Sequence, residues 1–489
     1  MEESKIVQYF EGKTIFITGA TGYLAKIFLE KILRVQPKLK KLFLLIRAVD
    51  KRSAEQRLHE EVLNTELFRV LKEKYGADLC PFLLSKIIPV CGDVSCENLG
   101  ISDSKLRDEM WQEVDIIVNS AATTRFDERY DVAMGINALG AMHVQKFARK
   151  CSKLEMFLHV STAYVHGSSV GLVSEKPFHM GETLDGAKIS YLDINTEKKI
   201  IKERLRGLEA QNATELEIAS VMRNLGIDRA KLHGWPNTYS FTKAMGEMLL
   251  ENLKENIKVI IVRPTIITST YKEPFSGWIE GIRTVDSIFV SYGKGKLKFF
   301  VGDPDSTLDM IPGDMVVNSM VVAMAVHSNQ PSHRLIYHIG SSRTNPLKYA
   351  RMRLLMYSFL TKNPLLDKGG NPIRVEKAKI LETMASFHRY IAIRYLPFIK
   401  MLKLANMILC NHFESLHANA KRRINHSVRL AELYKPYLFF QGIFDDSNAE
   451  NLRTTIRGSE AFNFDPECIQ WEDYFMNTHF SGIIKYVLK

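Results

Sequence analysis

The sequence predicts an α/β fold, in which a doubly wound parallel sheet of the Rossmann type is followed by a smaller, mainly helical domain. Short apolar runs rich in β-branched residues alternate with segments of helical periodicity over roughly the first half of the chain. Strands that are joined through helices form right-handed βαβ units, and these units place the strands in one parallel sheet. The strands are expected at residues 14–18, 42–46, 86–90, 115–119, 156–160 and 258–262.

Two domains are expected from the point at which this alternation ends. The pattern fades from about residue 345, so we expect a first domain over residues 1–370 and a C-terminal domain over residues 380–489. A polar helical insert, rich in Lys, Glu and Arg, occupies about residues 195–230. This insert forms either a solvated helical hairpin or a lid over a substrate channel.

The charge of the chain is basic and unevenly distributed. The 489 residues carry a formal net charge of +11, and the pI is about 9.1. Residues 371–435 contain 12 Lys or Arg against 4 Asp or Glu, so a surplus of 8 lies in the C-terminal part. A basic protein suits nucleic acid, anionic lipid or phosphorylated small molecules. Given the motifs below, we expect a small-molecule partner and no nucleic acid.

One strongly apolar segment, Phe387–Cys410, is interrupted by Arg389, Arg394, Lys400 and Lys403. Such a segment either lies peripherally in a membrane interface or packs on the main domain. No stretch of about 18 uncharged apolar residues occurs, so we expect no conventional transmembrane helix. The acidic start of the chain resembles no signal or transit peptide, and we expect the cytoplasm or the cytosolic face of the endoplasmic reticulum.

The six cysteines are sparse, and none forms a C-x-x-C pair. This usage indicates free thiols in a reducing compartment. Cys410, His412 and His417 lie close together in the sequence, but they fit no standard zinc spacing. We therefore expect these residues to be structural and the protein to hold no metal.

A glycine motif follows the first predicted strand and opens the first long helix. In this context it matches the dinucleotide fingerprint, because Gly19 permits a tight turn and Gly22 lets the backbone approach a pyrophosphate at the helix N-terminus. Ala25 is small enough for helix and strand to pack closely. The cofactor contacts expected here come from Thr18, Gly19, Thr21, Gly22, Tyr23 and Leu24.

The residue that ends the second strand indicates which dinucleotide binds. Sites that prefer NAD place a carboxylate there to hold the ribose 2′-hydroxyl. This chain has Arg47, followed by Lys51 and Arg52. A guanidinium pairs bidentately with a 2′-phosphate, so Arg47 favours NADPH unless it is an ordinary surface arginine.

Further cofactor contacts are expected after the later strands. Asp93 follows the third strand and is placed to meet the adenine edge, while small residues after the fourth strand let the cofactor pass. The remaining expected contacts are Val94, Ala121, Ala122, Thr123, Asn137, Pro264 and Thr265.

The catalytic pair is predicted to be Tyr239 and Lys243. Residues i and i+4 share one face of a helix, so the phenol and the ammonium point into the same site. A nearby ammonium favours the phenolate and lowers the tyrosine pKa towards working pH. Ser161 and Thr162 end the fifth strand, where a hydroxyl can bind a reacting carbonyl oxygen. The spacing to Gly167 favours Thr162, with Ser161 as the alternative.

Together these motifs resemble the extended short-chain dehydrogenase/reductases and, more narrowly, the alcohol-forming fatty acyl-CoA reductases of plants. The resemblance covers nearly the whole chain, and its C-terminal part is similar to the male-sterility domain of that family. The matching stretches are Thr18–Ala25, Phe126–Tyr130, Val160–Val165, Trp235–Tyr239, Arg263–Thr270, Pro274–Trp278, Tyr434–Tyr437 and Phe444–Asn448.

The resemblance implies an NADPH-dependent reduction of a long-chain fatty acyl-CoA to a primary alcohol through an aldehyde, in wax, suberin or related lipid synthesis. It implies that Thr162 and Tyr239 stabilise the oxyanion, that Tyr239 donates the proton, that Lys243 holds the nicotinamide ribose, and that Asn137 assists the proton relay. The alternatives are an aldehyde-forming reductase, a sterol or sugar-nucleotide dehydrogenase, and an NADP-binding scaffold without turnover.

Overall fold

The computed structural model describes residues 1–250, 257–330, 334–408, 412–456 and 458–488. These residues form two compact units. Unit 1 comprises residues 1–281, 309–345 and 443–489, and unit 2 comprises residues 282–308 and 346–442. Both units are discontinuous in sequence, and the domain boundary expected near residues 370–380 stays a prediction.

A seven-stranded sheet forms the centre of unit 1, and every neighbouring pair of strands is parallel. The order of the strands is β12-β7-β5-β4-β1-β2-β3, so the strand order reverses between β1 and β4. This arrangement confirms the predicted doubly wound Rossmann-type fold. The strands are β1 (Thr14–Thr18), β2 (Lys41–Ile46), β3 (Ile87–Cys91), β4 (Ile116–Asn119), β5 (Met156–Val160), β7 (Lys258–Pro264) and β12 (Arg334–Ile339).

The six strands predicted from the sequence are present within one or two residues of their expected bounds, but the seventh strand was not predicted. Strand β12 lies at the edge of the sheet and contains three polar or amphipathic residues, Arg334, Tyr337 and His338. An edge strand pairs with another strand on one side only, and β12 lacks the continuous apolar run of the inner strands.

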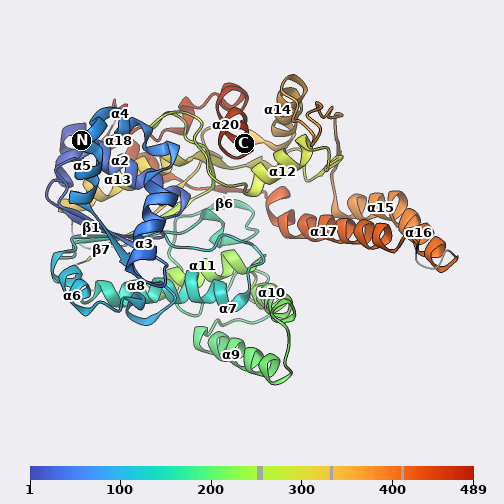
Figure 1. Ribbon diagram of the computed structural model, residues 1–489, viewed down its shortest axis with the longest axis horizontal. Helices are drawn as coiled ribbons and strands as arrows, with labels where there is room; N and C mark the ends of the chain where they lie inside the picture. The colour runs from blue at the N-terminus through green and yellow to red at the C-terminus, as the bar shows by residue number, and fades with distance from the viewer. Residues whose placement is uncertain (251–256, 331–333, 409–411, 457, 489) are drawn as a thin grey trace. The chain divides into compact units, whose positions relative to one another are not determined.

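Helices cover both faces of the sheet (Figure 1). On one face α2 (Tyr23–Val35) contacts α13 (Gly313–Val326), which also packs on β5 and β7. The other face carries an apolar core to which α6 (Ser104–Glu113) and α8 (Gly140–Ala148) contribute Met110 and Val144.

The helix α11 (Thr238–Leu249) carries the predicted catalytic pair, and ten of its twelve residues are buried. Asn237 caps it by accepting a hydrogen bond from the backbone of Ser240. Gly246 lets the helix approach the π-helical turn η5 (Met134–Leu139), since a Cβ at this position would lie 2.4 Å from the carbonyl oxygen of Asn137.

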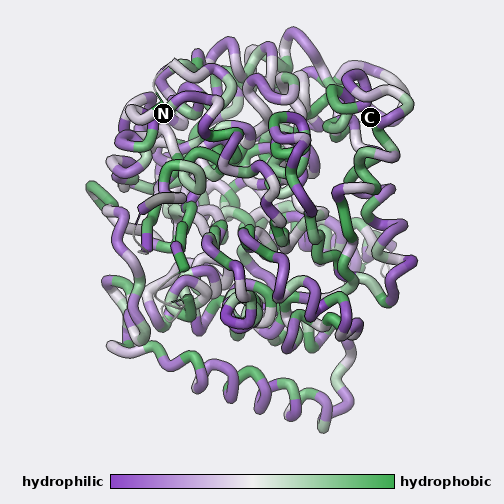
Figure 2. The backbone as a smooth tube through the Cα atoms, turned by 90° about the vertical axis from the view of Figure 1, so that its left-hand side faces the viewer, coloured by the Kyte–Doolittle hydropathy of each residue, from purple (hydrophilic) through white to green (hydrophobic). Residues whose placement is uncertain are grey.

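The predicted polar insert is a pair of helices, α9 (Ile194–Ala210) and α10 (Glu215–Leu232). Figure 2 shows α9, the lowest helix in both views, with hydrophilic and hydrophobic residues alternating along its length. Glu197 of α9 is buried and accepts hydrogen bonds from the Tyr130 hydroxyl (2.7 Å) and Arg229 Nε (3.0 Å). This network ties the hairpin to the core near α11.

The remaining elements of unit 1 are short. The helices are α1 (Glu3–Tyr9), α3 (Lys51–Leu58), α4 (Arg69–Tyr75), α5 (Leu79–Lys86), α7 (Tyr130–Ala133), α18 (Ser447–Thr455), α19 (Trp471–Asp473) and α20 (Phe480–Tyr486). Two short 3₁₀ turns are η6 (Ala163–His166) and η7 (His327–Asn329). The short strands are β6 (Gly171–Val173), β8 (Ile266–Thr268), β11 (Met310–Pro312) and most of β15 (Gly442–Phe444).

Unit 2 is mainly helical, as expected for the C-terminal region. Its helices are α12 (Thr284–Gly293), α14 (Tyr349–Lys362), α15 (Met384–Arg394), α16 (Leu396–Ile408) and α17 (Glu414–Leu438). Its two small sheets pair β10 (Thr307–Leu308) with β13 (Leu347–Lys348) and β9 (Phe299–Val301) with β14 (Lys379–Leu381). Among the residues that the structure describes, no helix combines the length and apolarity needed to cross a membrane.

Candidate active site

The glycine turn after β1 lies where the strand order reverses. Gly19 has φ of 70°, and a Cβ there would lie 2.7 Å from the backbone of Ala121 after β4. Only glycine fits this turn without strain. Gly22 directly precedes α2, so the free backbone N–H groups of the helix face the gap between β1 and β4. This geometry fits a pyrophosphate.

The other residues of the glycine motif lie at the start of α2, with Thr21 half-buried and Leu24 buried. Tyr23 is buried too, and its hydroxyl donates to the carbonyl oxygens of Thr268 (2.9 Å) and Trp278 (3.2 Å). Its ring stacks on Trp278 at 5.1 Å between centroids. The Tyr23 side chain therefore anchors α2, and its backbone is the part that borders the cofactor turn.

Arg47 directly follows β2 and is exposed. Among the described residues its guanidinium makes no ion pair, so it is available to an anion. Beyond β3, the Asp93 carboxylate accepts hydrogen bonds from the backbone and hydroxyl of Ser95, both at 2.8 Å. The neighbouring Val94 is buried, and its carbonyl oxygen lies 2.9 Å from His143 Nδ1.

The segment after β4 is tied to η5 by the buried Asn137. Its amide nitrogen donates to the carbonyl oxygen of Thr123 (3.1 Å) and to Thr242 Oγ1 (3.0 Å), and its amide oxygen accepts from the Thr123 backbone (3.0 Å). Ala121 is half-buried and Ala122 is exposed. Because both amide hydrogens of Asn137 are engaged, the residue shapes this loop; its expected part in a proton relay stays a prediction.

Lys243 is fully enclosed beneath the site. Its Nζ donates to the carbonyl oxygen of Val160 at the end of β5 (2.7 Å) and lies 3.4 Å from His159 Nε2. Burial lowers the pKa of Lys243 to about 8, against the opposing effect of Glu247 one turn further along. Tyr239, one turn before Lys243, is half-buried, and its ring lies 6.1 Å from that of Phe126.

The two candidate hydroxyl groups after β5 have different surroundings. Thr162 Oγ1 accepts a hydrogen bond from the backbone of Tyr164 (3.3 Å) and lies 3.5 Å from the carbonyl oxygen of Pro264. Ser161 Oγ is buried, and no described residue offers it a hydrogen-bond partner. Pro264 ends β7, and the next residue, Thr265, donates its backbone N–H to Ile339 (3.0 Å).

The structure therefore brings the predicted residues together at one edge of the sheet. They follow the carboxyl ends of β1, β2, β3, β4, β5 and β7, or lie on α11 and η5, and ligands bind at this edge in open α/β folds.

Sequence reasoning missed a buried cluster directly behind this edge. Arg263 of β7 is fully buried and binds Glu247 of α11 through two hydrogen bonds, of 3.0 and 2.5 Å. Its Nη1 also donates to His166 (2.9 Å) and lies 3.4 Å from His338 Nε2. Burial, and then the Arg263 charge, lower the pKa of His166 to about 2 and that of His338 to about 3. A signal for this cluster was an arginine inside an apolar strand.

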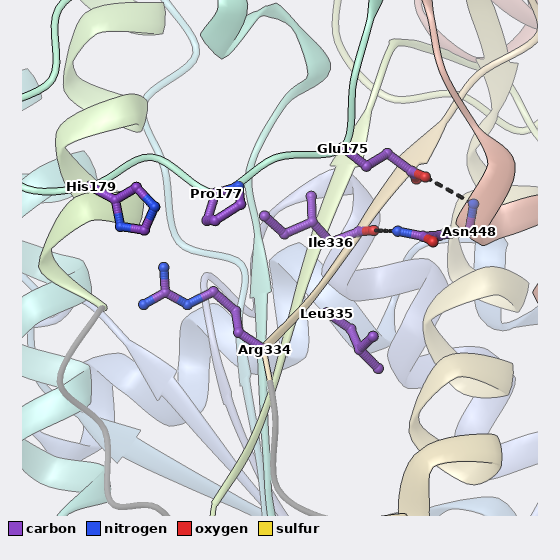
Figure 3. Close-up of a pocket in the computed structure, with 7 residues that line it drawn as sticks. All are labelled: Glu175, Pro177, His179, Arg334, Leu335, Ile336 and Asn448. Carbon is purple, nitrogen blue, oxygen red and sulfur yellow. Dashed lines mark hydrogen bonds between the residues drawn. The ribbon is translucent and has the colours of Figure 1, made fainter.

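A small cavity of about 240 Å³ lies beside edge strand β12 and contains none of the predicted site residues (Figure 3). Glu175 projects over it and accepts backbone hydrogen bonds from His338 (2.7 Å) and Asn448 (2.8 Å). The Asn448 amide donates to the carbonyl oxygen of Ile336 (2.9 Å). Burial raises the pKa of Glu175 to about 7. These bonds fasten the edge strand to α18.

A larger cavity of about 950 Å³ lies at the opposite edge of the sheet, beside β3. Leucine and isoleucine side chains from α3, α5 and β3 form much of its wall, including Leu58, Leu83 and Ile87. It, too, contains none of the predicted catalytic residues.

The five cysteines that the structure describes are free thiols. Cys410, named in the sequence analysis, lies outside the described residues.

Two family models match the chain. An NAD-binding model with the description "male sterility protein" matches residues 17–320, and a second model with the same description matches residues 394–489. The first domain is therefore an NAD(P)-binding Rossmann domain.

Solved structures support the fold. The terminal R domain from the myxalamid PKS-NRPS biosynthetic pathway is similar over 98% of this chain and 92% of that chain, with a TM-score of 0.58 and 16% identity. The reductase (R) domain of a non-ribosomal peptide synthetase from Mycobacterium tuberculosis has a TM-score of 0.55 at 16% identity, over 99% of this chain and 96% of that chain. At such identities the likeness concerns the fold alone.

Curated relatives match from end to end. A protein named "probable fatty acyl-CoA reductase 4" from Arabidopsis thaliana is 51% identical over 100% of both chains. The "alcohol-forming fatty acyl-CoA reductase" of Simmondsia chinensis is 48% identical, again over 100% of both chains. The chain belongs to the plant fatty acyl-CoA reductase family.

Proposed function

We propose that this protein reduces long-chain fatty acyl-CoA to the primary fatty alcohol, through the aldehyde, and releases CoA. The observation that carries the proposal is the pair of half-buried Tyr239 and buried Lys243 on α11, in a chain that is 48% identical over its whole length to a protein named as alcohol-forming. The hydroxyl groups after β5 and the glycine turn complete a reductase site.

NADPH, when bound, supplies the hydride for each of the two reductions. Thr162 and Tyr239 donate hydrogen bonds to the oxygen of the thioester as negative charge develops on it. The hemithioacetal then breaks its carbon–sulfur bond, so that CoA leaves as the thiol and the aldehyde remains. In the second reduction Tyr239 gives its proton to the alcohol oxygen. Lys243 holds the nicotinamide ribose and, as a cation, favours the tyrosinate that each donation leaves.

NADPH is favoured over NADH by Arg47, an exposed guanidinium at the end of β2 without an ion pair among the described residues. We expect Arg47→Ala to raise the KM for NADPH about tenfold or more and to leave the KM for NADH nearly unchanged, because only the 2′-phosphate is lost as a partner. Initial rates with both cofactors check this. Arg204→Ala, at an exposed arginine of α9, is the matched control. If Arg47→Ala raised the KM for NADH as much as the KM for NADPH, Arg47 would not be the residue that binds the 2′-phosphate.

The proposed site of action is the cytoplasm or the cytosolic face of the endoplasmic reticulum, with peripheral contact to the membrane in which acyl chains partition. Support comes from α15 and α16, where exposed apolar residues such as Ile393 and Met407 alternate with exposed cations such as Arg394 and Lys403. Such a surface binds anionic lipid through apolar area and charge together.

The direct test is incubation of the purified protein with NADPH and a panel of acyl-CoAs, followed by chromatography of the lipids. The proposal predicts fatty alcohol as the final product and only transient aldehyde. Aldehyde that accumulates without alcohol would identify an aldehyde-forming reductase. Turnover of sterols or sugar nucleotides but of no acyl-CoA, or no turnover at all, would reject the proposal.

A further inference from the structure

A row of buried polar side chains crosses three adjacent strands beneath the active site. Thr18 ends β1, Asn119 ends β4, and His159 lies one residue before the end of β5. The register pairs Thr18 with Asn119 and Asn119 with His159, so the three side chains stand on the same face of the sheet. They are 0%, 3% and 1% exposed.

The row is continuously hydrogen-bonded and ends at Lys243. The Thr18 hydroxyl lies 2.7 Å from Asn119 Oδ1, and Asn119 Nδ2 lies 3.0 Å from His159 Nδ1. His159 Nε2 lies 3.4 Å from Lys243 Nζ. On the far side of His159 the register partner is Ile261 of β7, so the polar row stops there. An unpaired polar group in this apolar core is strongly disfavoured, which makes each member depend on the next.

The Lys243 ammonium has three N–H donors, and β5 can take two of them. One is donated to the carbonyl oxygen of Val160 (2.7 Å), and His159 Nε2 is positioned to accept a second. The Asn137 amide oxygen, which could accept from an ammonium, accepts from the backbone N–H of Thr123 instead (3.0 Å). The third N–H remains for a ligand above the sheet.

The protonation of His159 follows from its surroundings. Burial, and then the Lys243 charge, lower the pKa of His159 well below its ordinary value, so the ring is neutral. A neutral ring accepts at one nitrogen and donates at the other. Facing a cation, Nε2 must accept, so Nδ1 carries the proton. The Asn119 amide must then be reversed end for end, so that its oxygen accepts from Nδ1 and its nitrogen donates to the Thr18 hydroxyl oxygen.

Few other charged or titratable groups face Lys243. On its own helix Glu247 acts on it, and Glu247 is paired with Arg263 of β7; Tyr239 lies one turn before Lys243. On β5, the titratable group that faces Lys243 is His159, among the described residues. His159 is therefore a neutral side chain that lies within hydrogen-bond distance of the ammonium.

We propose that His159, held by Asn119 and Thr18, is the positioning residue that fixes the Lys243 ammonium on β5 and keeps it protonated during turnover. The inference rests on the proposed function, since it gives Lys243 its role in the same reaction. His159 touches neither substrate nor cofactor; it acts through Lys243.

The kinetic test compares His159→Leu with His159→Gln across pH. Leucine removes the acceptor, so a cationic Lys243 is less favoured: kcat falls about tenfold, and the basic limb of the kcat/KM profile moves about one pH unit lower. Glutamine retains an acceptor oxygen, so His159→Gln should keep most of the wild-type kcat and most of the wild-type position of the basic limb. NADPH binding, followed by fluorescence, stays within about threefold in the two variants.

His327→Gln is the matched control, because His327 is a buried histidine that follows α13 and bonds Tyr337, away from the carboxyl edge of the sheet. It should leave the pH profile unchanged. A folded His159→Leu protein with the wild-type profile would overturn the proposal. So would a His159→Gln variant as impaired as the leucine variant.

A second test needs no turnover. In protein labelled with ¹⁵N-histidine, the signal absent from His159→Gln identifies the His159 ring, and its two nitrogen shifts report the tautomer. The proposal predicts a proton on Nδ1 and a lone pair on Nε2 near neutral pH. A proton on Nε2 would overturn it. If the wild type reduces no acyl-CoA, the proposed function fails, while the tautomer still decides the part that His159 plays toward Lys243.

Discussion

Helices α11 and α16 differ in how they use polar and apolar side chains. Helix α11 buries ten of its twelve residues, including the charged Lys243 and Glu247, and both of these charges have partners on neighbouring strands. Helix α16 buries two of its thirteen residues, and Met407 is 76% exposed a few residues from the solvated Lys403.

The comparison teaches where single residues matter. A buried charge that loses its partner destabilises the protein or the transition state by about 3–5 kcal/mol, so each group on α11 is held in one arrangement. Exposed side chains are screened and hold no fixed geometry, and they act through summed area and charge. One substitution should therefore disable the region of α11, whereas the surface of α15 and α16 should need several.

The largest effect is expected at Tyr239. Tyr239→Phe removes the proton donor and should lower kcat about a thousandfold while NADPH binding is retained. Steady-state rates and fluorescence titration measure the two quantities. Tyr191→Phe, at an exposed tyrosine, is the control. Substantial turnover by Tyr239→Phe would show that another group donates the proton.

The next largest effect should distinguish the two hydroxyl groups after β5, those of Thr162 and Ser161. Thr162→Val should lower kcat/KM about a hundredfold, because a donor to the developing oxyanion is lost. Ser161→Ala should change kcat/KM less than about fivefold and should not lower stability, because it deletes a buried hydroxyl that no described residue satisfies. The reverse ranking would make Ser161 the catalytic hydroxyl.

The buried histidines behind α11 should make the protein acid-labile. The folded-state pKa values of His166 and His338, about 2 and about 3, lie below the ordinary 6.5, so the unfolded chain takes up more protons as pH falls below that value. Glu175, with a pKa of about 7, opposes this between about pH 7 and 4.5, because its folded form holds a proton that the unfolded form releases.

The histidines outnumber this carboxyl, so the free energy of unfolding should fall by about 1–3 kcal/mol per pH unit between about pH 6 and 5. Urea titrations at several pH values measure the slope. Glu175→Gln removes the opposing group and should steepen it. A stability that rises as the pH falls through this range would contradict the neutral assignment of His166 and His338.

The smallest effect on chemistry is expected from α15 and α16. Replacing Arg389, Arg394, Lys400 and Lys403 together by Glu should abolish flotation with anionic vesicles, yet change kcat on a short, soluble acyl-CoA less than about twofold. The matched control reverses four exposed cations on α9: Lys198, Lys199, Lys202 and Arg204. Flotation that survives reversal on α15 and α16, or equal loss in the control, would reject docking through this surface.

Much of the fold and of the site could be predicted because their signals are local in sequence. The inner strands are continuous apolar runs, and Tyr239 and Lys243 share a helix face by their spacing alone. The glycine turn is recognisable because strand, turn and helix follow one another directly.

The missed features depend on contacts between residues far apart in the chain. Strand β12 is defined by pairing with β7, about 75 residues earlier, and its own residues are mixed in character. Residues 443–489 belong to unit 1 although unit 2 precedes them. His159 and Arg263 lie inside apolar strand runs, and only the register and the packing of α11 show which charges they meet.

The most direct test of the account is the stoichiometry of the wild-type enzyme with a long-chain acyl-CoA. Oxidation of NADPH is followed by absorbance, and released CoA is followed with a thiol reagent in the same sample. The account predicts two NADPH oxidised for each CoA released, with the alcohol as product. One NADPH for each CoA, with the aldehyde as product, would contradict it.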